Sequence, residues 1–325
     1  PIGLFGEEYW SPALEIESTC RDTNRAGQAV GYSKNFVASR LDAWLWENGA
    51  CDRLGFGDLD WQADIITENG LIAGRRGDGL AFLRRQGSFE TLGLSGSTEV
   101  PGLMYGANAV RAVNSNGLVA GLVNRGVGQA YEYVPGGTDT WVYRDGQTML
   151  VGLRGPLYVS ETFHRSGTAW AMNDSGVVVG WSNRVQSGSS GNDAWAWKDG
   201  RTYLIGLLGP LGENGAGTRY VYVTHLLASG LVVGYSQRVG VNGEADQQTW
   251  VWSNGVTERI GYWQTGYTQS LILDAHENGR VLGASEYVGT DGVLGRAGWS
   301  WYNGETRSLG LTGLPYSTAG GTRLC

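Results

Sequence analysis

A short phrase that recurs six times constrains the fold of this chain more than any other feature of its sequence. The phrase has the form Asn-x-x-Gly-x-Val-x-Gly, and its two glycines lie four positions apart in every copy. Self-similarity at a period of about 50 residues predicts a repeat architecture. The first glycines of the six copies are Gly27, Gly70, Gly117, Gly176, Gly230 and Gly279.

A second phrase follows each copy of the first and pairs two aromatic residues. It reads aromatic-x-aromatic-x-x-Gly, with a further glycine six residues later. The second unit is degenerate, because Phe82 keeps the first aromatic position while Arg84 takes the second. Residues i and i+2 point to the same face of a strand, so we expect these rings to form core between neighbouring repeats. The complete pairs are Trp44/Trp46, Trp141/Tyr143, Trp195/Trp197, Trp250/Trp252 and Trp299/Trp301.

Each unit is predicted to form four strands. The Asn-x-x-Gly, Asn-Gly and Asp-Gly sequences are hairpin-turn chemistry, and no stretch has a helical apolar period. The predicted fold is therefore all-β, a single domain forming a six-bladed β-propeller from six four-stranded repeats. Another closed or stacked β arrangement, or a larger propeller with blades missing here, stays open. The expected units are 7–57, 58–96, 97–155, 156–209, 210–264 and 265–313, with 314–325 as a C-terminal tail.

The first residues resemble the end of a repeat. Ile2-Gly3-Leu4-Phe5-Gly6 is similar to the segments 92–96 and 309–313, which follow the fourth strand of their units. Two explanations are open. Either a preceding unit was removed, or this strip closes the ring against the last blade.

Composition excludes several classes of protein. A hydrophobic content of 41% is too high for a disordered chain, and the net charge of −7 disfavours a nucleic-acid partner. No apolar run is long enough to span a bilayer, and no signal peptide is visible at Pro1. Cys20 and Cys51 lie in the same unit, and either a disulfide or two free thiols is open; Cys325 has no assigned partner.

The two phrases resemble the HAF-type repeats of bacterial extracellular proteins. The copy most similar to that family runs from Ala171 to Ser182 and continues with Ala194-Trp195-Ala196-Trp197 and Ile205-Gly206-Leu207. The resemblance covers nearly the whole chain and implies a secreted or cell-surface location, with no settled activity. The chain departs from the family pattern by using Trp where Phe is frequent.

No motif for a metal, a cofactor or a serine nucleophile is present. The three histidines, His164, His225 and His276, have no carboxylate or histidine at ligand spacing, so we expect no metal site. No cofactor is expected, because no glycine-rich sequence opens a helix with Lys-Ser/Thr. The G-x-S-x-G sequence is absent as well.

Arginines recur at equivalent positions and are the candidate ligand-binding residues. The fourth residue after the second Gly of the first phrase is Arg in units three to five, and arginines also precede the first strands of units four and five. Guanidinium groups on one rim suit carboxylate or sulfate ligands, although arginines that cap carbonyls and pair with acidic neighbours explain the pattern as well. Unit two carries Arg75 and Arg76 nearby. The candidates are Arg125, Arg184, Arg238, Arg165 and Arg219.

Three functions follow from these observations. The first is a secreted or surface binding module for extracellular carbohydrate, for instance an anionic polysaccharide, or for another surface partner. The second is a lyase on uronate-containing glycans, with His164, Tyr158 and Tyr220 as candidate acid and base groups near the arginines. The third is a structural surface or filament subunit. The sequence leaves open whether the chain is an enzyme and what its oligomeric state is.

Overall fold

The computed structural model describes most of the chain in two compact units. The first comprises Pro1–Val151 with Thr162–Asp174, and the second comprises Gly152–Glu161 with Ser175–Cys325. The described residues are 2–55, 57–100, 102–126, 136–185, 191–209, 218–239, 245–264, 266–288, 292, 294–310, 317–318 and 321–322. Cys325 and the side chain of Arg238 lie outside the described part.

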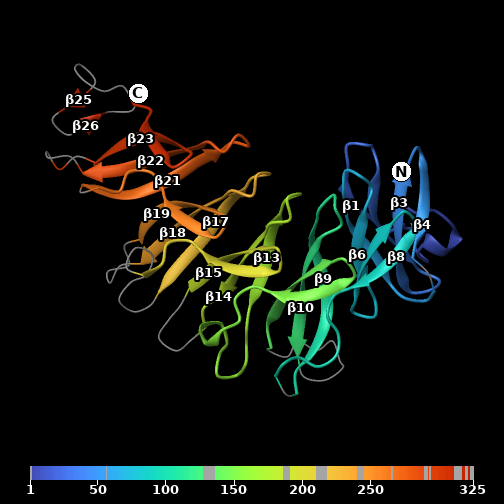
Figure 1. The fold of residues 1–325 in the computed structure, drawn as a ribbon. Helices are drawn as coiled ribbons and strands as arrows, with labels where there is room; N and C mark the ends of the chain where they lie inside the picture. The colour runs from blue at the N-terminus through green and yellow to red at the C-terminus, as the bar shows by residue number, and fades with distance from the viewer. Residues whose placement is uncertain are drawn as a thin grey trace. The chain divides into compact units, whose positions relative to one another are not determined.

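The first unit contains three antiparallel four-stranded sheets, each formed by consecutive strands (Figure 1, blue to green). The first strand of each sheet contacts the strands of the sheet before it, so the sheets pack face to face. The 3-10 helix η1 (Glu7–Tyr9) precedes them. The strands are β1 (Ser18–Thr23), β2 (Ala29–Asn35), β3 (Arg40–Glu47), β4 (Ala50–Leu54), β5 (Trp61–Ile66), β6 (Ile72–Arg76), β7 (Ala81–Arg85), β8 (Ser88–Leu92), β9 (Met104–Val113), β10 (Val119–Gly126), β11 (Thr138–Arg144) and β12 (Gln147–Val151).

The fourth repeat is divided between the two units. Its first strand, β13 (Gly167–Met172), belongs to the first unit and contacts β9, β10 and β11. Its other strands, β14 (Val178–Asn183), β15 (Gly191–Lys198) and β16 (Arg201–Ile205), belong to the second unit. The four strands of this sequence repeat are therefore not all in the same compact unit.

The second unit continues the same pattern. Helix η2 (Pro156–Tyr158) precedes β14, and β15 pairs in parallel with β17, which joins the fourth and fifth repeats in one sheet. The sixth repeat is a separate four-stranded sheet. The remaining strands are β17 (Arg219–Leu226), β18 (Val232–Val239), β19 (Ala245–Ser253), β20 (Val256–Arg259), β21 (Tyr267–Ala275), β22 (Val281–Val288), β23 (Leu294–Tyr302), β24 (Glu305–Ser308), β25 (Ser317–Thr318) and β26 (Gly321–Thr322).

The recurrent Asn-x-x-Gly phrase forms the turn between the first two strands of a repeat. In the first repeat, the Gly27 N–H donates to the Asn24 carbonyl at 3.1 Å, and the Gln28 N–H donates to Asn24 Oδ1 at 3.1 Å. Gly27 has a φ of 80°, in the left-handed region that glycine adopts without strain. The Asn24 side chain also donates to the Thr67 carbonyl at 3.0 Å, which links one repeat to the next.

The aromatic pairs form the core, as predicted. The first ring of every complete pair is 0% exposed. Between the first two sheets, Val30 and Leu54 pack against Trp61, Ala63 and neighbouring residues of the second sheet. Burial of these rings and aliphatic side chains between sheets is the main stabilising contribution in such a stack.

The prediction of an all-β chain of four-stranded repeats is confirmed. Closure into a six-bladed ring within a single domain stays a prediction. Cys20 and Cys51 are free thiols in the structure. Among the described residues, no helix is long and apolar enough to cross a membrane.

Candidate functional site

A buried aspartate joins the third and fourth repeats. Asp139 lies in β11, two residues before Trp141, and its carboxylate accepts two bonds from Arg165, from Nε at 2.5 Å and from Nη2 at 2.6 Å. Arg165 Nη2 also donates to Glu99 at 2.6 Å. Burial disfavours the charged form of Arg165, but the carboxylates of Asp139 and Glu99 outweigh it and hold the pKa of Arg165 above its ordinary value. The result is an ion-paired cluster in which Asp139 and Arg165 are buried and Glu99 is partly exposed.

The next junction repeats this arrangement. Asp193 lies two residues before Trp195 and accepts a hydrogen bond from Arg219 Nε at 2.5 Å. The Tyr158 hydroxyl donates to the other oxygen of Asp193 at 2.6 Å. Each arginine lies 26 residues after its aspartate in both junctions. The same two sequence positions thus produce the same buried pair.

Two of the three strand-two arginines also have described, buried side chains. Arg125 is 2% exposed, donates through Nη1 to the Phe163 carbonyl at 3.1 Å, and places Nε 3.4 Å from Asp139. Arg184 is 8% exposed. The Arg238 backbone pairs with Asp246 in the β18–β19 ladder, while its side chain lies outside the described part.

These contacts bear on the predicted arginine rim. Arg125, Arg165 and Arg219 cap carbonyls and pair with buried carboxylates, which is the alternative that the sequence left open. Their guanidinium groups are committed to the packing between repeats, so a ligand would have to displace short ionic hydrogen bonds. A ligand-binding role for these residues, and for Arg184 and Arg238, stays a prediction.

The first repeat has a related cluster with different partners. Asp42 lies two residues before Trp44 and accepts hydrogen bonds from the Tyr9 hydroxyl at 2.9 Å, from Asn35 at 3.1 Å and from Arg53 at 2.7 Å. An aspartate at this position therefore serves the first, third and fourth repeats.

The second repeat lacks this cluster. Leu80 stands two residues before Phe82, where the first, third and fourth repeats have aspartate and the fifth and sixth have Gln248 and Ala297. Gly106 stands eleven residues before Gly117, where the fourth and fifth repeats have Arg165 and Arg219. The hairpin is also shortest here: eight positions separate Gly74 from Phe82, and thirteen separate Gly31 from Trp44 in the first repeat. Less side-chain volume is available to fill this junction.

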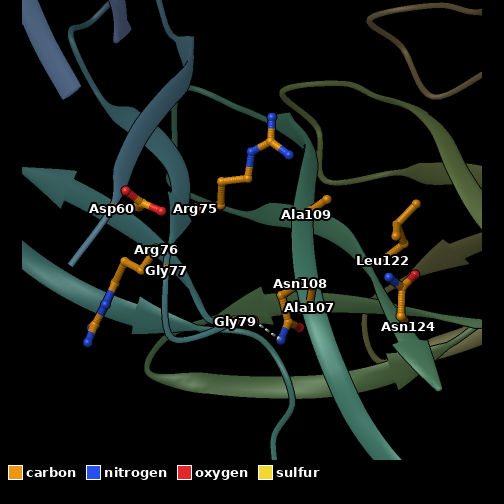
Figure 2. Close-up of a pocket in the computed structure, with 10 residues that line it drawn as sticks. All are labelled: Asp60, Arg75, Arg76, Gly77, Gly79, Ala107, Asn108, Ala109, Leu122 and Asn124. Carbon is orange, nitrogen blue, oxygen red and sulfur yellow. Dashed lines mark hydrogen bonds between the residues drawn. The ribbon is translucent and has the colours of Figure 1, made fainter. Parts of the chain in front are cut away.

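A hollow of about 420 Å³ lies at this junction (Figure 2). One wall comes from the end of β6 and the following turn, and the other from β9 and β10. Figure 2 shows Arg75 and Arg76 leaving their strand in opposite directions, as successive strand residues do. The lining residues are Asp60, Arg75, Arg76, Gly77, Gly79, Ala107, Asn108, Ala109, Leu122 and Asn124.

The charges at the hollow are close to balanced. Arg75 Nε lies 3.5 Å from Asp64, and Arg76 Nη2 donates to Asp78 at 2.6 Å. Burial raises the pKa of Asp64, while the neighbouring cations Arg75 and Arg21 oppose that rise. The Arg75 side chain is still 42% exposed, so its guanidinium is accessible to a ligand.

The polar groups at the hollow divide into fixed and accessible ones. The Asn108 carboxamide is committed to the backbone, because it donates to the carbonyls of Gly79 and Leu94 and accepts from the Leu94 N–H at 2.9 Å. Asp60 uses one oxygen to accept the Leu41 N–H at 2.7 Å. Arg75 and the exposed Asn124 supply donors beside the apolar side chain of Leu122. A ligand with hydroxyl groups and a C–H face fits this mixture.

The candidate acid and base residues lie in different units. His164 is half-buried and belongs to the first unit, whereas Tyr158 and Tyr220 belong to the second. Tyr158 is 6% exposed, and its burial together with its bond to Asp193 raises the pKa of its hydroxyl. Tyr220 stacks on Tyr222 with ring centroids 6.4 Å apart.

Sequence reasoning missed the hollow although the signal was present. The second repeat is degenerate in sequence at Arg84, and it also has the shortest connection between Gly74 and Phe82 and lacks the charged pair at Leu80 and Gly106. Within the described part of the chain, no group of three or more metal-ligating side chains occurs.

Comparison with known proteins gives remote structural similarity. No family model and no curated protein matches the chain. Similar structures include the β-propeller domain of the trilobed protease from Pyrococcus furiosus, 13% identical over 90% of this chain and 83% of that chain, with a TM-score of 0.34. Dipeptidyl peptidase 4 from Porphyromonas gingivalis is 13% identical over 95% of this chain and 48% of that chain, with a TM-score of 0.43.

A carbohydrate-bound structure is also among the similar ones. A variant of the Aleuria aurantia lectin in complex with α-methyl-L-fucoside is 11% identical over 90% of this chain and 93% of that chain, with a TM-score of 0.31. Similarity at this level carries no argument about ligand or activity, so the function is argued below from the chain's own residues.

Proposed function

We propose that this chain is a β-propeller-type binding module that takes a sugar residue of an extracellular glycan in the hollow between its second and third repeats. The observation that carries the proposal is the lined hollow of about 420 Å³ itself, at a junction where Leu80 and Gly106 stand at the positions of Asp139 and Arg165. A single sugar unit is small enough for such a volume.

The chemistry of the lining favours a hydroxyl-rich, uncharged ligand. Arg75 is offset by Asp64 and Arg76 by Asp78, so the hollow has no large surplus of positive charge for an anion. Sugar hydroxyls accept hydrogen bonds from guanidinium and carboxamide groups and donate to carboxylates such as Asp60. The apolar face of a sugar ring can pack on Leu122. A neutral sugar is therefore favoured over the anionic polysaccharide considered from the sequence.

The resemblance to HAF-type repeats supports the extracellular part of the proposal. It comes from Ala171–Ser182 and the equivalent phrases, and it implies a secreted or surface location. The six repeats are proposed to be six blades. If the six blades close into one ring within a chain, the chain is expected to stay monomeric. If they do not close, copies of the chain are expected to associate.

Binding without catalysis is better supported than lyase activity. A uronate lyase needs a free base beside a carboxylate-binding arginine. The Tyr158 hydroxyl donates a hydrogen bond to Asp193 and has a raised pKa, and Arg165 is held by Asp139. Both groups are engaged in structural contacts.

The test is ligand binding by a variant in which the hollow is filled. A glycan array identifies a ligand, and isothermal titration then compares the wild-type chain with Ala109→Trp. We expect affinity to fall at least about tenfold, because an indole occupies the space of the sugar ring. Arg75→Ala should weaken binding as well, through loss of a donor. Val37→Trp, at a side chain that is 80% exposed, is the matched control and should bind normally.

The outcomes separate the ligand classes. Preference for neutral glycans that is lost in Ala109→Trp supports the proposal. Preference for uronate or sulfated glycans, or binding that Ala109→Trp leaves intact, places the ligand elsewhere and overturns it. Formation of an ultraviolet-absorbing unsaturated product from uronate polymers would favour the lyase.

A further inference from the structure

Each repeat has one side that packs on the following repeat, which we call its outgoing face. Two aliphatic positions mark it, one directly before the second glycine of the first phrase and one directly before the last glycine of the repeat. In the first repeat these are Val30 and Leu54, and both contact the core of the second repeat. In the fifth repeat they are Val233 and Ile260, which pack with Trp299 of the sixth.

The outgoing face of the sixth repeat is exposed. Its two marker positions are Leu282 and Leu309, which are 36% and 57% exposed. The equivalent side chains of the five preceding repeats are all 0–4% exposed. They are Val30, Ala73, Ala120, Val179 and Val233 at the first position, and Leu54, Leu92, Val151, Ile205 and Ile260 at the second.

The N-terminal segment takes the place of a preceding repeat at the other end of the series. Between internal repeats, the residue after the last glycine donates its N–H to a serine of the next repeat: Leu153 to Ser182 at 3.2 Å and Leu207 to Ser236 at 3.0 Å. The Leu4 N–H donates to Ser33 Oγ at 3.1 Å. All three pairs are separated by 29 residues.

The backbone conformation and the side-chain packing of the N-terminal segment both hold it against the first repeat. Gly3 has a φ of 137°, and a Cβ there would lie 2.2 Å from Ser18 Oγ. Leu4 and Tyr9 pack on Trp44, whose ring is 0% exposed. The first repeat is therefore covered as if another repeat preceded it.

The N-terminal segment that covers the first repeat has an apolar outer surface. Ile2 is 45% exposed, Phe5 50% and Trp10 45%. Terminal repeats of stacked proteins ordinarily present polar outer faces that keep the array soluble. Here apolar side chains are exposed at the N-terminal segment and on the outgoing face of the sixth repeat, and exposed apolar patches mark interaction surfaces.

We propose that copies of this chain associate head to tail. The outgoing face of the sixth repeat, marked by Leu282 and Leu309, packs against the N-terminal segment of a second copy, marked by Ile2 and Phe5. The contact continues the repeat-to-repeat interface that already operates inside each copy. It joins two different surfaces, so it generates chains of copies or closed rings of several copies.

The first measurement is sedimentation velocity of the full chain over a wide range of concentration. We expect the mass to rise with concentration for the wild type. Leu309→Glu and Phe5→Glu should each shift association to at least about tenfold higher concentration, since each buries a charge in an apolar contact. The matched control is Val256→Glu, which alters a side chain that is 68% exposed in the β19–β20 hairpin of the fifth repeat and should associate normally.

Mixing the two variants tests the polarity of the contact. Leu309→Glu keeps an intact N-terminal segment, and Phe5→Glu keeps an intact outgoing face. At concentrations where the wild type associates, each variant alone should stay monomeric, whereas their mixture should form a dimer that grows no further. A wild type that stays monomeric throughout overturns the proposal. So does a mixture that forms no dimer. Thermal unfolding of both variants shows whether each change acts on folding instead of association.

Discussion

The junction between the second and third repeats differs from the junction between the third and fourth in what fills it. In the later junction, Asp139 and Arg165 form a bidentate pair that is nearly inaccessible to solvent. In the earlier one, Leu80 and Gly106 occupy those positions and a hollow remains. The strands around both are arranged alike. A position that holds a buried ion pair in one copy of the repeat therefore holds uncharged residues beside a hollow in another.

The largest expected effect comes from breaking the filled junction. Asp139→Ala leaves the Arg165 guanidinium buried without its main partner, and loss of one member of a buried pair typically destabilises by about 3–5 kcal/mol. Urea denaturation followed by tryptophan fluorescence measures the change. Asp78→Ala removes a half-exposed ion pair beside the hollow and should lower the free energy of unfolding by no more than about 1 kcal/mol. Equal losses in both variants would contradict the distinction between the two junctions.

A smaller effect is expected at the junction of the fourth and fifth repeats. Tyr158→Phe removes the hydroxyl that donates to Asp193 at 2.6 Å but keeps the ring. Hydrogen bonds to charged groups contribute about 1.5–3 kcal/mol, so the free energy of unfolding should fall by that amount. Tyr302→Phe, at an exposed ring, is the control and should change it little. An unchanged Tyr158→Phe variant would mean that Arg219 alone satisfies Asp193.

The smallest effect concerns alkaline pH and the first repeat. Burial, and then the hydrogen bond to Asp42, raise the pKa of Tyr9 from 10.0 to about 12. A raised pKa means that the folded state holds the proton more tightly, so this contribution to stability is complete below pH 10 and is lost as the pH rises through about 12. In Tyr9→Phe, the stability should fall less steeply over that range. Denaturation curves at several alkaline pH values measure the slope, and an unchanged slope would contradict the assignment.

Sequence periodicity predicted the strands and the aromatic core because both depend on local pattern. Two aromatic residues two positions apart, such as Trp44 and Trp46, lie on one face of a strand. An Asn-x-x-Gly turn is formed by hydrogen bonds among its own residues. The pairing of Asp139 with Arg165 was harder to foresee, because it joins strands of different repeats. A sequence does not distinguish an exposed arginine from a buried one. The predicted rim of ligand-binding arginines could therefore not be told apart from a set of internal ion pairs. The hollow was missed because it depends on how the end of β6 and its turn meet β9 and β10 of the next repeat, which no local pattern records.

The division of the fourth repeat has a practical consequence for anyone who shortens this chain. β13 is the first strand of the fourth repeat, but it packs with the strands of the repeat before it. A fragment that ends where its last sequence repeat ends would leave β9, β10 and β11 without that cover. A stable N-terminal fragment should therefore extend through Asp174 and carry the opening strand of a repeat that it does not complete.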